Sequence, residues 1–148
     1  MISCSRRTFS DFSLAISPSL VIFAGAVPYA ELPAYFRAGN VFAMPCRSRR
    51  LGLDIEALGA VFLQAQAVGR PAVVGNSGGA PESVKPNETG VVVDPESPDA
   101  IGDAIAGLLN DPARAERMGT LGAEWVHDAW TWDVMTSRLR GMLHEIVE

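Results

Sequence analysis

The sequence "EALGAVFLQAQAVGRPAVV" (Glu56–Val74) contains one helix pattern followed directly by one strand pattern. Between Gly59 and Gly69 the apolar residues follow helical spacing, and glycine is a typical residue at a helix end. The run Pro71–Val74 ends in two valines and predicts a short buried strand. A helix that leads directly into a buried strand is typical of a βαβ unit, and therefore of a parallel sheet.

The same alternation continues on both sides of this stretch. Strands are expected at 19–27 ("SLVIFAGAV"), 41–46 ("VFAMPC"), 71–76 ("PAVVGN") and 91–94 ("VVVD"), and helices at 29–40, 60–69 and 97–111. Ser97 is expected to cap the last of these helices, and Asp99 lies in its first turn. Residues 112–148 form a helical tail with breaks. The sequence therefore predicts an α/β fold, a Rossmann-like parallel sheet with flanking helices and an extended helical C-terminal tail.

Composition restricts the class of protein. The chain has 148 residues, 48% of them hydrophobic, with a formal net charge of −5 and a pI of about 5.0. This acidity argues against a nucleic-acid partner, which requires a basic surface. Cys4 and Cys46 are too few for a disulfide framework or a zinc site, and we expect two free thiols in a reducing cytoplasm and no metal. Arg6 and Arg7 precede an apolar run, but Asp11 and Pro18 interrupt it, which argues against an export signal.

Two Gly-containing loops follow predicted strands, "RSRRLGLDIEALG" (47–59) and "SGGAPESVKPNETG" (77–90). In open parallel sheets, ligands bind beyond the carboxyl ends of the strands, where both loops are expected. A helix that begins near Gly59 offers unpaired N–H groups and a positive dipole end to a phosphate, and glycine permits a close approach. Taken alone, however, Glu56 is also consistent with a simple charge in the first helical turn, and Gln64 with a solvated side chain on the helix face.

The stretch "FAMPCRSRRLGLDIEALGAVFLQAQAVGRPAVVGNSGGAPE" (42–82) resembles the C-terminal, nucleotide-sugar-binding half of family-four retaining glycosyltransferases of the GT-B fold. Within that family it particularly resembles the GDP-mannose-dependent phosphatidylinositol mannosyltransferases. The resemblance runs from about Leu20 to the end of the chain. It implies a donor-binding domain over residues 19–148, preceded by an unmatched segment, 1–18.

The resemblance also implies roles for individual residues. In that family the first glutamate of a Glu-x7-Glu pattern contacts the donor sugar, which makes Glu56 the expected catalytic residue. The second glutamate binds the ribose hydroxyls, and here that position is Gln64. Gln retains one acceptor oxygen, so we expect weakened rather than abolished donor binding. The remaining donor-binding positions are Asp54, Ile55, Ala57, Leu58 and Gly59 beside the sugar and diphosphate, and Ala26, Val27 and Pro28 beside the nucleobase.

Other polar and aromatic residues have less specific expectations. Arg47, Arg49 and Arg50 form either a solvated basic turn or a contact to a phosphate or an anionic acceptor. We expect Gly78 and Gly79 to serve loop geometry, and Glu82 to be a turn carboxylate or a site residue. Packing or surface roles are expected for His127 and His144 and for Trp125, Trp130 and Trp132.

Two parts of the enzymes in that family have no match in this sequence. The acceptor-binding half and the Ser-Arg-x4-Lys-Gly segment that neutralises the departing diphosphate have no counterpart, so we expect a truncated enzyme, weakly active or inactive alone. Its implied partners are a nucleotide sugar, a phosphoinositide-type lipid acceptor and a missing N-terminal half. The implied location is the cytoplasm, at the inner face of the membrane. Self-association through the apolar side chains of residues 131–148 is the other expectation. The alternative function is a non-catalytic nucleotide-binding module or a gene remnant. A receiver-type regulator is disfavoured, because the strand ends lack its acidic pocket.

Overall fold

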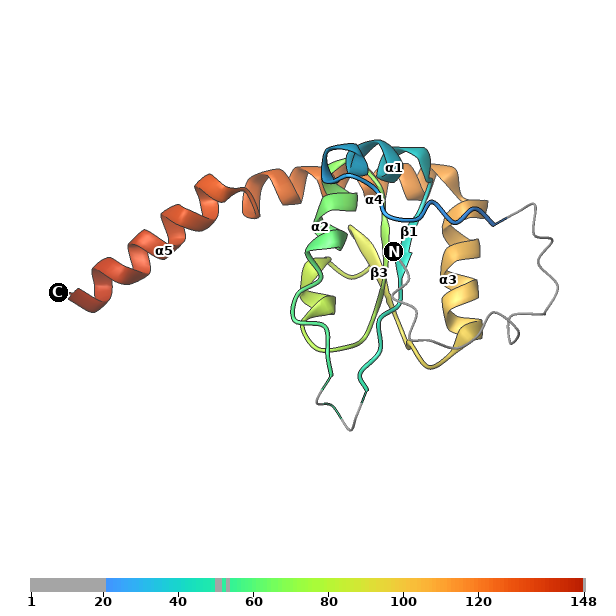
Figure 1. Cartoon of the computed structure of the whole chain (residues 1–148), viewed down its shortest axis with the longest axis horizontal. Helices are drawn as coiled ribbons and strands as arrows, with labels where there is room; N and C mark the ends of the chain where they lie inside the picture. The colour runs from blue at the N-terminus through green and yellow to red at the C-terminus, as the bar shows by residue number, and fades with distance from the viewer. Residues whose placement is uncertain (1–20, 50–51, 53, 148) are drawn as a thin grey trace.

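A computed structural model describes residues 21–49, 52 and 54–147 (Figure 1). Its sheet has three parallel strands in the order β1 (Phe42–Met44), β2 (Ala72–Gly75) and β3 (Gly90–Val93). Ala43 pairs with Val73, which pairs in turn with Val91. The predicted α/β fold with a parallel sheet is confirmed, and three of the four expected strands form where the sequence places them.

Helices cover both faces of this sheet. The helix α1 (Leu32–Ala38) follows the short helix η3 (Tyr29–Glu31), α2 (Ala60–Ala67) joins β1 to β2, and η5 (Ala80–Ser83) lies between β2 and β3. After β3 come α3 (Pro98–Asn110), α4 (Pro112–Ala129) and α5 (Trp132–Val147). In Figure 1, α2 and α3 lie on opposite sides of the strands, and α4 crosses above them.

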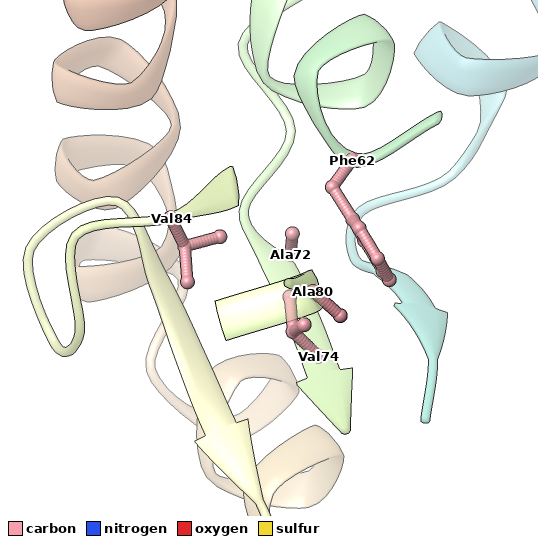
Figure 2. Close-up of a cluster of buried hydrophobic side chains, with 5 residues drawn as sticks. All are labelled: Phe62, Ala72, Val74, Ala80 and Val84. Carbon is pink, nitrogen blue, oxygen red and sulfur yellow. The ribbon is translucent and has the colours of Figure 1, made fainter. Parts of the chain in front are cut away.

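The core has two parts because successive side chains of a strand point to opposite faces. Val74 packs with Phe62 of α2 and with Ala80 and Val84 around η5, as Figure 2 shows. Val73 packs on the other face with Leu108 of α3 and Met118 of α4. Every residue of β2 is buried, so the central strand supports both clusters.

The helix ends follow the sequence closely. Ser97 Oγ accepts a hydrogen bond from the Ala100 N–H at 3.2 Å, which confirms the predicted cap of α3. Asp111 caps α4 in the same way, through the Arg114 N–H at 2.9 Å. Because a capping side chain satisfies an amide that has no partner inside the helix, each is expected to contribute about 1 kcal/mol.

The helix α5 extends away from the sheet, at the far left of Figure 1. Its apolar side chains are exposed, as predicted: Trp132 (85% exposed), Leu139, Met142, Leu143 and Ile146. Trp130, just before α5, stays half-buried with its ring 5.7 Å from that of Trp125. Within residues 21–49, 52 and 54–147, no helix combines the length and hydropathy that a membrane crossing requires.

The strand expected at 19–27 is wrong over its described part. Residues 21–27 form no strand, and the Ile22 and Phe23 side chains are 90% and 75% exposed. A strand is stabilised by pairing with a neighbour and by burial of a face, more than by its own composition. An apolar, β-branched run therefore indicates a tendency to form a strand, but it does not show that a neighbouring strand is available for pairing.

Candidate functional site

The first loop of the candidate site leaves β1 at the carboxyl edge of the sheet and extends below the strands in Figure 1. Part of it folds back on itself. Arg49 and Asp54 form an antiparallel bridge, in which the Arg49 N–H donates to the Asp54 carbonyl at 2.8 Å. The side chains of Arg47 and Arg49 are exposed, and Arg50 lies outside the described residues. Arg47 and Arg49 are therefore presented to solvent in the loop after β1.

Glu56 lies between this turn and α2, with its side chain half-buried between exposed Ile55 and exposed Ala57. Burial raises the pKa of the Cys46 thiol above its ordinary value, and the Glu56 carboxylate raises it further. The Gly79 N–H, in the loop after β2, donates to the Glu56 carbonyl at 2.9 Å, which places Glu56 at the edge where β1 and β2 end. At the end of β1 the Cys46 thiol also donates to the Met44 carbonyl at 3.4 Å. The predicted sugar-binding carboxylate is thus at the carboxyl edge of the sheet.

The start of α2 is shaped by Gly59. Its φ of 72° is in the left-handed region, and a Cβ there would overlap the ring of Phe62. Glycine is therefore required by the backbone and by core packing, independently of any ligand. Within the described part of the chain, no side chain caps this end of α2. Its positive end follows directly on the loop that carries Glu56, with N–H groups left unpaired. Gln64 lies on α2 with its side chain half-buried.

The second Gly-containing loop lies directly against the first. The Gly79 N–H donates to the Glu56 carbonyl at 2.9 Å, and a Cβ at Gly79 would overlap the Ala57 carbonyl oxygen. Gly78, with a φ of 55°, has no room for a Cβ beside the Glu56 carbonyl. This geometry agrees with the prediction that the two glycines serve loop conformation. Glu82, on η5, is exposed.

Sequence reasoning missed Gln66, two residues after Gln64. Its side chain is 0% exposed, and its Nε2 donates to the Phe62 carbonyl at 3.1 Å and to the Ser83 carbonyl at 2.7 Å. The amide joins α2 to η5. The available signal was helical spacing, because Gln66 follows the buried Phe62 by four residues and so shares its face.

Other predicted residues lie elsewhere. Residues 26–28 lie beside α1 at the top of Figure 1, at the opposite end of the strands from the Glu56 loop. The structure does not bring Ala26, Val27 and Pro28 to that loop, because the strand expected to carry them to the carboxyl edge does not form. His127 and His144 are exposed on α4 and α5, as expected for surface roles.

Comparisons with known proteins place this geometry in a family. Residues 17–125, more than half of the chain, match the family model described as glycosyl transferases group 1. The GDP-mannose-dependent alpha-(1-6)-phosphatidylinositol monomannoside mannosyltransferase of Mycobacterium tuberculosis is 52% identical, over 83% of this chain and 32% of its own. The protein of that name from Mycolicibacterium smegmatis is 47% identical, over 93% of this chain and 35% of its own.

Solved structures show the same relationship. A sucrose-phosphate synthase from Thermosynechococcus elongatus superposes with a TM-score of 0.77 at 29% identity, over 88% of this chain and 31% of its own. The chain spans about a third of the length of the curated relatives that it matches. By the family model, by these relatives and by its fold, the chain belongs to the glycosyl transferases group 1.

Proposed function

We propose that these residues form the nucleotide-sugar-binding part of a retaining mannosyltransferase, with GDP-mannose as the donor and a phosphatidylinositol-type lipid as the acceptor. The names of relatives at 52% and 47% identity specify GDP-mannose and a phosphatidylinositol mannoside, which supports both assignments. Because the chain spans about a third of those relatives, the activity assigned to these 148 residues is donor binding.

The observation that carries this proposal is the position of Glu56 next to the uncapped start of α2. A carboxylate at the carboxyl edge can accept hydrogen bonds from sugar hydroxyls. The helix α2, which begins four residues further on, offers N–H donors to the diphosphate. Donor sugar and diphosphate are neighbours in the ligand, as Glu56 and α2 are neighbours in the chain. Gln64, further along α2, pairs with the ribose hydroxyls in this proposal.

The proposed binding uses no metal, as the family resemblance implies. Neutralisation of the diphosphate then depends on the positive end of α2 and on cationic side chains, for which Arg47 and Arg49 are the candidates on this loop. Lipid transfer is proposed to take place at the cytoplasmic membrane surface. Addition of EDTA is expected to leave donor affinity unchanged, and a loss of affinity would contradict the metal-free proposal.

The test is calorimetric titration of the purified chain with GDP-mannose, GDP and UDP. We expect GDP-mannose to bind more tightly than GDP, and GDP more tightly than UDP. Glu56→Gln should weaken the binding of GDP-mannose more than the binding of GDP, because GDP lacks the sugar that Glu56 is proposed to contact. No binding of any of the three at millimolar concentration would overturn the proposal. Binding of GDP with nothing gained from mannose would favour the alternative, a nucleotide-binding module.

A further inference from the structure

Two contacts join the loop after β1 to the loop after β2. Ser48 Oγ and Ser77 Oγ share a hydrogen bond of 3.0 Å, and Ser77 is nearly fully buried. Further along, the Gly79 N–H donates to the Glu56 carbonyl at 2.9 Å. The second loop therefore holds the first loop at two points, one on each side of the Arg49–Asp54 bridge.

The second contact is possible only without side chains on the glycines. A Cβ on Gly79 would overlap the Ala57 carbonyl oxygen, and one on Gly78 would overlap the Glu56 carbonyl oxygen. The two loops thus meet backbone to backbone. Because the side chains of Ile55 and Ala57 are exposed, packing of the neighbouring residues does little to fix this part of the first loop.

The second loop is itself anchored to α2. The Gln66 amide donates to the Ser83 carbonyl at 2.7 Å, and the Ser83 hydroxyl donates to the Ala80 carbonyl at 2.6 Å, which ties η5 together. From Gln66 the contacts run through η5 to Gly79 and on to Glu56. From Glu56 the chain returns through Gly59 to α2. Glu56 is thus linked to α2 by two routes, one along the chain and one through η5.

We propose that the Ser77–Gly79 segment, held in place by Gln66, is a positioning element that sets the direction of the Glu56 side chain. This inference rests on the proposed function, in which the Glu56 carboxylate contacts the donor sugar. Ser77, Gly79 and Gln66 touch no ligand in it. They act by fixing the backbone of Glu56, which limits the directions from which its carboxylate can reach the sugar and spares the ligand part of the cost of ordering the loop.

The first test is Gly79→Ala, with Gly102→Ala in α3 as the matched control, because a Cβ at Gly102 meets nothing within 4 Å. Gly79→Ala should weaken the binding of GDP-mannose by about tenfold or more and that of GDP by a smaller factor, because the position of Glu56 matters for the sugar, which GDP lacks. Combining it with Glu56→Gln should add nothing further. The control should bind both ligands as the unaltered chain does.

A second readout needs no ligand. In a chain whose other cysteine is replaced by serine, the pH profile of Cys46 alkylation reports the distance of the Glu56 carboxylate. It should move to lower pH when Gly79→Ala displaces Glu56. Ser48→Ala removes one contact without adding bulk. It should lower GDP-mannose affinity by roughly two- to fivefold. If Gly79→Ala does not fold, Ser48→Ala tests the positioning role in its place, by binding and by the alkylation profile.

The outcomes separate the two proposals. If the unaltered chain binds neither GDP nor GDP-mannose, the proposed function fails, and the alkylation profile still tests whether Gly79 positions Glu56. If a folded Gly79→Ala chain keeps both the preference for GDP-mannose over GDP and the alkylation profile of the unaltered chain, the positioning role is wrong. A shifted profile together with a lost preference supports it.

Discussion

Replacing Gln66 by Glu exchanges an amide for a carboxyl group of nearly the same shape at a fully buried position. In the unaltered chain the amide nitrogen donates to the carbonyls of Phe62 and Ser83. The amide oxygen is buried and has no hydrogen-bond partner among the residues that the structure describes. An ionised carboxylate at this position would direct negative oxygens at two carbonyl oxygens. We therefore expect Gln66→Glu to keep its proton in the folded state.

The sign and size of the effect follow from that proton. Burial raises the folded-state pKa of the new carboxyl above its unfolded value, which is about 4.3 for Glu. Below that value both states are protonated, and the cost is one lost hydrogen bond, about 1 kcal/mol. Above it the unfolded state ionises while the folded state does not, so the free energy of unfolding falls by about 1.4 kcal/mol per pH unit. At pH 7 the added loss approaches 4 kcal/mol, a large part of the typical 5–15 kcal/mol for a domain.

The matched control is Gln64→Glu, the same exchange two residues earlier on the same helix at a half-buried position. Its free energy of unfolding should stay within about 0.5 kcal/mol of the unaltered chain at every pH. The assay is urea denaturation of the three chains at several pH values between about 4.5 and 7.5. If the difference between Gln66→Glu and the unaltered chain does not grow with pH, the buried amide does not make the contacts described.

Three further predictions use other residues. Gln64→Glu should raise affinity for GDP by roughly 5- to 30-fold in calorimetry, because a carboxylate accepts charge-assisted bonds from the ribose; unchanged affinity would remove Gln64 from the proposed site. Glu56→Gln should speed alkylation of Cys46 below pH 9, since it removes a charge that raises the thiol pKa; an unaltered rate would mean that the two groups are not close. Leu108→Ala, at a side chain 1% exposed, should cost about 2–5 kcal/mol of unfolding free energy, whereas Leu139→Ala, 53% exposed, should cost less than about 1 kcal/mol; equal costs would show that α5 is packed.

Most of the fold was predictable because its signals are local. Helical periodicity, the Ser97 cap and the runs of valine each act within a few residues of the chain, and the structure forms α2, α3, β2 and β3 where those signals stand. The expected strand at 19–27 depended on a partner strand, which no local pattern supplies. In the structure, residues 26–28 lie at the opposite end of the strands from the Glu56 loop (Figure 1).

The site was predictable in composition and only partly in geometry. The sequence placed Glu56 in a loop at the carboxyl edge and Gly59 at a helix start, and both lie there. It gave no sign that Gly79 donates to the Glu56 carbonyl, because the two residues belong to different loops. The distance between loops depends on how η5 packs against α2, which is a tertiary property.

The two glutamines of α2 show how such a property separates identical residues. In sequence, Gln64 and Gln66 differ by two positions, and a helix rotates them about 200° apart. Phe62 faces the sheet, and Gln66, four residues later, lies on the same face of the helix, where its amide donates to the Ser83 carbonyl of η5. Gln64 is left half-buried on another side, in the position that the family resemblance gives to ribose binding. A Glu at position 64 therefore tests recognition and a Glu at position 66 tests the framework. Only an unfolding measurement beside the binding measurement can tell a weakened site from a weakened fold.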